Sequence, residues 1–164
     1  MVPWEPRKRN NQDDLLATYH GKVKGRMYAE VPVPSGRGHR DWDRDSDAGW
    51  ERRRINAIRV EAATDNETIV KYTENKDEAH EVIEDASVKV IEISLTPSRR
   101  HVGHVIVGQD LLEADYRPSS IKKVILGENI DSDFRWVCEQ RDIEVVELQR
   151  DESAWVYEEK RGDG

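Results

Sequence analysis

The chain has 164 residues, and its 34 Asp and Glu against 26 Lys and Arg give a formal net charge of −8 at pH 7. This length is one domain's worth and buries a core without metals or disulfides, and the single cysteine, Cys138, excludes an internal disulfide framework. No apolar run approaches membrane-spanning length, and residues 1–11 lack the apolar centre of a signal peptide. The sequence predicts one soluble, cytoplasmic domain over residues 1–164, with a core at about 10–148 and charged tails.

Most of the basic residues are arginines. High acid content with few lysines is typical of proteins from a salt-rich cytoplasm, where anionic side chains keep a chain soluble. We infer a halophilic archaeal source or a virus of such an archaeon, in which case the protein could also reside in a virion. Net acidity normally argues against nucleic-acid binding, but that argument weakens for a surface adapted to molar salt. Local basic clusters then count for more than the total charge.

In the first half of the chain, residue patterns predict one amphipathic helix followed by strands. The helix covers residues 10–20, and alternation of apolar and polar residues predicts strands over 26–33 and 54–63. A short strand over 68–72 is a candidate hairpin partner of the strand before it. One or two helical turns are expected over 78–83.

The second half of the chain predicts a strand over 88–95, a crossover helix over 98–116 and a strand over 121–127. Two strands joined by a crossover helix are expected to be parallel. A helix over 131–140 and a last strand over 143–148 follow. The fold class is therefore α/β, with a central mixed sheet of about five strands flanked by helices.

Glu92 is an ionisable residue in the middle of the most strand-like run, residues 88–95. A central strand buried on both faces is expected to be almost entirely apolar, because a charge there carries a desolvation cost. Glu92 and Ser94 stand near the carboxyl end of this strand, where ligand sites of strand–helix–strand units gather. Glu92 is therefore a candidate site residue; the alternative is a structural carboxylate paired with Arg54 or Arg59 across the sheet.

From about residue 10 to 148, the order of elements resembles the restriction-endonuclease-like, or PD-(D/E)xK, superfamily, and within it small archaeal nuclease-like proteins. The residues that carry the resemblance are Tyr28-Ala29-Glu30-Val31-Pro32-Val33, Arg53-Arg54-Ile55-Asn56-Ala57-Ile58-Arg59, Val90-Ile91-Glu92-Ile93-Ser94 and the helix from Val102 to Leu112. In that superfamily, one strand ordinarily carries an Asp and the next a Glu, one residue and a Lys. Residues two apart on a strand share a face, so the Glu and the Lys emerge together beside the Asp.

The resemblance implies a Mg²⁺ site in which two carboxylates hold the ion and the lysine stabilises charge in the transition state. Here the Asp position is Asn56 and the Lys position is Ser94, and both changes remove charge. Glu92 remains, and Glu30 matches a position where some relatives keep an acidic residue. The implied catalytic positions are thus Glu92, Asn56, Ser94 and Glu30, with Glu92 and Glu30 as ligands that would bind Mg²⁺ only weakly. Asn56 is alternatively an ordinary hydrogen-bonding residue of the sheet.

Two basic clusters, Arg52-Arg53-Arg54 and Arg99-Arg100-His101, flank the strands that matter. If the protein binds DNA, phosphate contacts are expected from Arg53, Arg54, Arg99, Arg100, Lys122 and Lys123, and such contacts position a duplex without identifying its sequence. A solvated charged surface is the alternative. His101 and His104 are either polar surface residues or an i,i+3 metal pair.

Three functions remain open from the sequence. The first is a nuclease-like protein with lost or weakened catalysis that acts as a nucleic-acid-binding or assembly module. The second is an active Mg²⁺-dependent nuclease with a relocated basic residue such as Arg99 or Arg100. The third is a structural component of a virion or another complex, as a homo-oligomer or with partner proteins. Fold alone does not decide among them.

Overall fold

The computed structural model describes residues 4, 10–23, 25–33, 54–61, 69–72 and 76–151. Within these ranges the helices are α1 (Asn11–His20), α2 (Lys76–Ile83), α3 (Arg99–Tyr116) and α4 (Ser132–Gln140). The strands are β1 (Arg26–Pro32), β2 (Arg54–Val60), β3 (Val70–Lys71), β4 (Ser87–Ile93), β5 (Ser120–Gly127) and β6 (Ile143–Glu147). Arg53 and most of the two predicted tails lie outside the described residues.

The strands form one mixed sheet in the order β3-β1-β2-β4-β5-β6. β1, β2 and β4 are antiparallel neighbours, whereas β5 and β6 run parallel to β4. This confirms the predicted α/β class and the parallel pair on either side of the crossover helix; the sheet has six strands, counting the two-residue β3, where about five were expected.

The position of β3 differs from the prediction of a hairpin with β2. β3 pairs with β1 instead, in parallel, through Tyr28–Val70 and Ala29–Lys71. β2 has β1 on one side and β4 on the other, so both of its hydrogen-bonding edges are taken. The free edge of β1 is the place left for β3.

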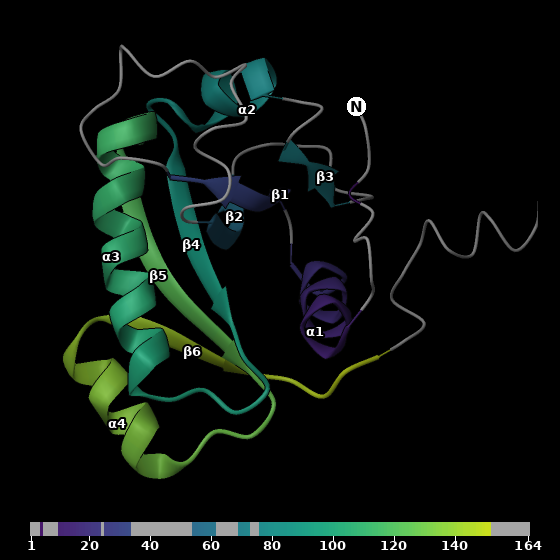
Figure 1. The fold of residues 1–164 in the computed structure, drawn as a ribbon, viewed down its shortest axis with the longest axis vertical. Helices are drawn as coiled ribbons and strands as arrows, with labels where there is room; N and C mark the ends of the chain where they lie inside the picture. Colours follow the sequence, from purple (N-terminus) through teal and green to yellow (C-terminus); the bar gives the residue numbers. More distant parts are fainter. Residues whose placement is uncertain are drawn as a thin grey trace, which may run out of the picture.

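Helices cover both faces of the sheet (Figure 1): α3 and α4 lie on one face and α1 on the other. We call these the α3 face and the α1 face. Each has its own cluster of buried apolar side chains, which on the α3 face includes Val90, Val105, Leu112, Ile125 and Phe134. The cluster on the α1 face includes Leu15, Leu16, Ala57, Ile91 and Val124. Successive side chains of β4 and β5 point to opposite faces and are buried in one or the other of these two clusters, as expected of central strands.

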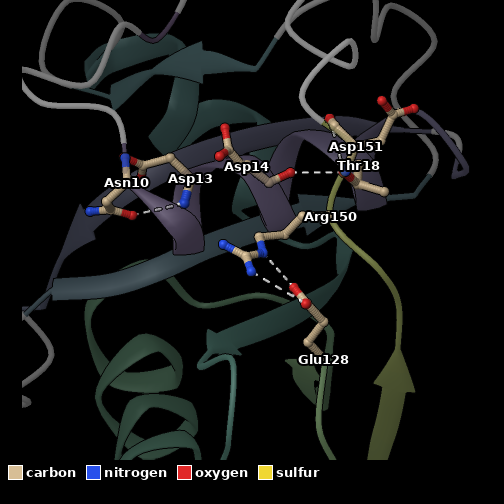
Figure 2. Close-up of polar contacts among 7 residues, drawn as sticks. All are labelled: Asn10, Asp13, Asp14, Thr18, Glu128, Arg150 and Asp151. Carbon is tan, nitrogen blue, oxygen red and sulfur yellow. Dashed lines mark hydrogen bonds and ion pairs between the residues drawn. The ribbon is translucent and has the colours of Figure 1, made fainter.

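The chain beyond β6 returns to α1 (Figure 2). The Asp151 N–H donates to Thr18 Oγ1 at 2.8 Å, and the Arg150 Nε donates to Glu128 Oε2 at 2.6 Å. Figure 2 also shows how α1 begins, with Asn10 Oδ1 accepting from the Asp13 N–H at 3.0 Å as a helix cap. These contacts join residues 150 and 151 to the residue after β5 and to α1. None of the helices in the described part of the chain is long and apolar enough to cross a membrane.

Candidate functional site

Glu92 lies near the carboxyl end of β4, on the face that α3 covers. Its side chain is 15% exposed, and the His104 Nδ1 donates to its Oε1 at 3.2 Å. The contact arises because β4 and α3 are consecutive: the chain leaves β4, turns at residues 94–98 and returns as α3 over the same face. The partner of Glu92 is therefore His104 rather than the alternatives Arg54 and Arg59, and Arg59 contacts Tyr19 of α1.

The surroundings of Glu92 shift its protonation. Burial raises the pKa of the Glu92 carboxyl, and this effect outweighs the hydrogen bond and charge of His104 and the charge of Arg100, which lower it. Glu92 therefore carries the desolvation cost that its position in the strand predicted.

A cavity of about 520 Å³ opens beside Glu92, between α3 and the sheet. Its volume lies within the range of roughly 300–1,000 Å³ that is usual for small-molecule sites. Most of its lining is apolar, and the residues that line it within the described part of the chain are Val33, Arg54, Ile55, Val90, Glu92, Gly103, His104, Val107, Gly108 and Leu111. Three side chains among them, Arg54, Glu92 and His104, are charged or can become charged, and they meet at this cavity from β2, β4 and α3.

The side chains of Asn56 and Glu30 both have hydrogen-bond partners outside the proposed metal site. Asn56 Oδ1 accepts the Ile93 N–H at 2.9 Å, just beyond the last β2–β4 register pair. Asn56 is thus a hydrogen-bonding residue of the sheet, in agreement with the alternative prediction. Glu30 is exposed, and its Oε2 accepts the Trp4 Nε1–H at 3.2 Å. Trp4 belongs to the cluster on the α1 face, and Glu30 does not line the cavity.

The cationic candidates separate into two groups. Arg99 and Arg100 are exposed in the first turn of α3, one turn before Gly103 and His104 of the cavity wall. Lys122 pairs with Lys89 in the sheet, and alternation with Val124 places it on the α1 face. Lys123 is half-buried and is not part of the cavity lining. The structure therefore places Arg54 in the lining of the cavity and Arg99 and Arg100 in the first turn of the helix that carries His104, and the two lysines do not line the cavity.

Ser94 follows β4, and its N–H donates to Leu126 O at 3.0 Å, so it continues the strand by one residue. Two of the oxygen atoms at this position that could bind Mg²⁺ already have hydrogen-bond partners. Glu92 Oε1 accepts a hydrogen bond from the His104 imidazole, and the side-chain oxygen of Asn56 accepts one from the backbone N–H of Ile93. A hard cation such as Mg²⁺ prefers several oxygen ligands. The described residues also contain no group of three or more His, Cys, Asp or Glu arranged to hold a metal ion.

His101 caps α3. Its Nδ1 accepts the Ser98 N–H at 2.9 Å, and its ring centre lies 6.0 Å from that of His104. Burial, followed by the charges of Arg100 and His104, lowers the pKa of His101. His101 Nδ1 thus acts in helix capping, a role that the i,i+3 spacing alone did not reveal. Cys138 is buried, as predicted.

Gly103 was not predicted from the sequence to be a cavity residue. It lies inside α3, where glycine lowers helix stability by roughly 0.5–1 kcal/mol relative to alanine. A Cβ atom at Gly103 would meet no atom within 4 Å, whereas at Gly108 it would meet Ile55 and Val90 at 3.6 Å. Packing against the sheet thus does not explain the glycine at 103. The available signal was its spacing of four residues from Val107, which puts the two on one side of the helix.

Comparisons of the chain with protein-family models, with curated proteins and with solved structures found no match. The chemistry of the site therefore has to be inferred from its own residues. These are a partly buried carboxylate bonded to an imidazole, an apolar cavity beside it, and arginines at the start of α3.

We expect Gly103→Ala to raise the free energy of unfolding by about 0.5–1 kcal/mol, because the methyl group adds helix propensity and meets no neighbour. Urea unfolding followed by circular dichroism measures the change. Gly127→Ala is the contrasting variant, since its Cβ would come within 2.9 Å of Ser94 O and of Pro97 Cδ and should destabilise the fold. A loss of stability in Gly103→Ala would show that position 103 is structurally required.

We expect Glu92→Gln to raise the free energy of unfolding at pH 7, by up to about 1 kcal/mol, because it removes a partly desolvated charge while its amide oxygen still accepts from His104. A carboxyl whose folded-state pKa is raised costs stability as pH rises from the unfolded pKa through the folded one. The advantage of the variant should therefore vanish below about pH 4, close to the ordinary glutamate pKa. Unfolding curves from about pH 3 to pH 8 test this, with Glu113→Gln, an exposed change on α3, as control. A variant less stable than the wild type at pH 7 would contradict the argument.

Proposed function

We propose that the protein is a restriction-endonuclease-like, PD-(D/E)xK-type chain that has lost phosphodiester cleavage and binds nucleic acid through the surface beside Glu92. The topology supports the proposal: β1, β2 and β4 are antiparallel neighbours in the sheet, and β4 is followed by the crossover helix α3 and the parallel strand β5. A carboxylate on the third of these strands faces the crossover helix. Fold alone does not establish function, so the site carries the argument.

The observation that carries the loss of cleavage is the contact between Glu92 and His104. In a metal-dependent nuclease of this kind, the Glu would be accompanied by a second carboxylate. Here its partner is an imidazole donor, and the residue at the Asp position, Asn56, accepts a backbone N–H instead. A cation is disfavoured where the neighbouring group donates a hydrogen bond to the same carboxylate oxygen. The fold thus keeps groups that can bind a ligand but lacks the pair of carboxylates that would bind a metal ion.

The binding role is supported by the arginines at the start of α3. Arg99 and Arg100 are exposed, and Arg54 lines the cavity next to Glu92 and His104. Guanidinium groups bind phosphate through paired N–H donors, and several on one surface suit a phosphate backbone. The net charge of −8 is a property of the whole chain and is compatible with such a local surface in high salt.

We expect Arg99→Glu/Arg100→Glu to weaken duplex DNA binding at least about tenfold and to reduce the slope of log K against log [salt] by about two. Fluorescence anisotropy with a labelled duplex, over a series of salt concentrations at which circular dichroism shows a folded chain, measures both. Arg117→Glu/Arg141→Glu is the matched control, because it reverses the same number of charges at two exposed arginines that precede β5 and β6, at the amino end of the parallel strands. The absence of wild-type binding at any salt concentration would overturn the binding role.

Two other results would redirect the proposal. Metal-dependent DNA cleavage that disappears in Glu92→Gln would favour an active nuclease with a relocated basic residue. A stable oligomer without nucleic-acid affinity would favour a structural component of a larger assembly. Mg²⁺ and Mn²⁺ titration calorimetry belongs with these measurements, and we expect no saturable binding at Glu92.

A further inference from the structure

The cavity beside Glu92 is larger than a phosphate contact requires. Its walls are aliphatic, formed by Val33, Ile55 and Val90 on the sheet side and by Val107 and Leu111 of α3. Arginines that bind a phosphate backbone need no such space behind them. An apolar cavity of about 520 Å³ with a few polar groups suits a flat or compact organic group.

Gly103 supports the view that this space serves an occupant. A Cβ atom there would meet nothing within 4 Å, and almost any other residue would favour the helix more. The glycine leaves open the part of the wall directly before His104. Space that neither packing nor helix formation requires is expected where a ligand enters.

Glu92 supplies a hydrogen-bond acceptor in the wall of the cavity. Its Oε1 accepts from His104, whereas its Oε2 accepts no hydrogen bond from the part of the chain that the structure describes. An ionised carboxylate only accepts hydrogen bonds, so the complementary group on a ligand is a pair of adjacent N–H donors. The burial that raises the pKa of Glu92 also strengthens such bonds, because the local dielectric is low.

The charges around the cavity complete the description of the ligand. Arg54 lines it, and Arg100 lies one helical turn before His104, close enough for its charge to lower the pKa of Glu92. A ligand with an apolar ring, adjacent N–H donors and an attached phosphate matches the aliphatic walls, the carboxylate and the arginines together. These are the properties of a nucleotide.

We propose that this cavity binds an unpaired guanine base, whose N1–H and N2–H groups donate to Glu92 while its phosphate lies at Arg54 and Arg100. Guanine is the base that presents two neighbouring donors on its pairing edge; adenine and cytosine place an acceptor beside their amino group, and uracil places acceptors on both sides of its single N–H. The inference rests on the proposed function for its class of ligand. It makes Glu92 a specificity-determining residue rather than a remnant of catalysis.

The test is calorimetric titration of GMP, AMP, CMP and UMP into the full chain. We expect GMP to bind at least about tenfold more tightly than the others, since a paired hydrogen bond to a base edge contributes roughly that much or more. Glu92→Gln should lower GMP affinity by about tenfold to a hundredfold, because the amide N–H₂ would face a guanine donor. Glu113→Gln should leave it unchanged.

Gly103→Leu provides an independent arm, because it fills the cavity without changing any charge. It should abolish GMP binding and keep duplex binding through Arg99 and Arg100. Equal binding of all four nucleotides, no GMP binding, or GMP binding unaffected by both Glu92→Gln and Gly103→Leu would each overturn the inference. Duplex binding without GMP binding overturns this inference alone, whereas GMP binding without duplex binding overturns the proposed duplex surface alone.

Discussion

Leu112→Ala is expected to lower the free energy of unfolding by about 2–5 kcal/mol. Leu112 is 0% exposed and belongs to the cluster on the α3 face, so its truncation leaves a cavity that the neighbouring side chains only partly fill. The loss of stability would concern the helix that carries His104 and the cavity wall. Urea unfolding monitored by circular dichroism measures it.

Leu111→Ala is the matched control, with the same chemical change one residue earlier. Leu111 is only half-buried and lines the open cavity, so we expect a loss of about 1 kcal/mol or less. Equal losses at positions 111 and 112 would mean that α3 does not pack on the sheet through the face that carries Leu112.

The helices and most strands of this chain could be predicted because their signals are local. The crossover helix over 98–116 differs by one residue from α3, and the strand over 121–127 differs by one residue from β5. Partner choice is not local. β3 was correctly located along the chain but was assigned to the wrong neighbour, because its pairing depends on which sheet edge remains free, and a segment of two paired residues carries no information about that.

The candidate site shows the same division. That Glu92 lies in a central strand followed by a helix was evident from the pattern of apolar residues. Its partner was not, since the choice among His104, Arg54 and Arg59 depends on the rotation of α3 over the sheet and on the two faces of β2. The cavity was also invisible in the sequence, because it is bounded by residues from β2, β4, α3 and the end of β1 together.

Lys122 shows that the alternation of side chains along a strand determines on which face of the sheet a residue lies. It was grouped with the arginines because it is basic and lies next to the crossover unit. In a strand, however, neighbouring residues point to opposite faces, and Lys122 shares the α1 face with Val124. Basic residues that are close in sequence therefore do not always lie on the same surface. Arg99 and Arg100, in contrast, lie in one turn of α3.

Asn56→Asp/Ser94→Lys is expected to raise Mg²⁺ or Mn²⁺ affinity at least about a hundredfold over the wild type, or roughly 2.7 kcal/mol. Asn56 is hydrogen-bonded to Ile93, the residue after Glu92, so an Asp there brings a second carboxylate beside Glu92. Its oxygen can still accept the Ile93 N–H, which keeps the sheet intact. Ser94 continues the strand two residues after Glu92, so the introduced lysine would emerge on the same face as Glu92. Titration calorimetry measures the affinity.

Asn129→Asp is the control, because Asn129 is exposed and the change repeats the Asn-to-Asp substitution outside the site. A gain confined to the double variant would show that the backbone around Glu92 keeps the geometry of a metal-dependent nuclease and that two neutral side chains removed its chemistry. No gain would mean that the contact with His104 has reshaped the site beyond the two substitutions. In that case Glu92 is better understood as a hydrogen-bond acceptor for a ligand than as a former metal ligand, and the resemblance would describe the path of the chain alone.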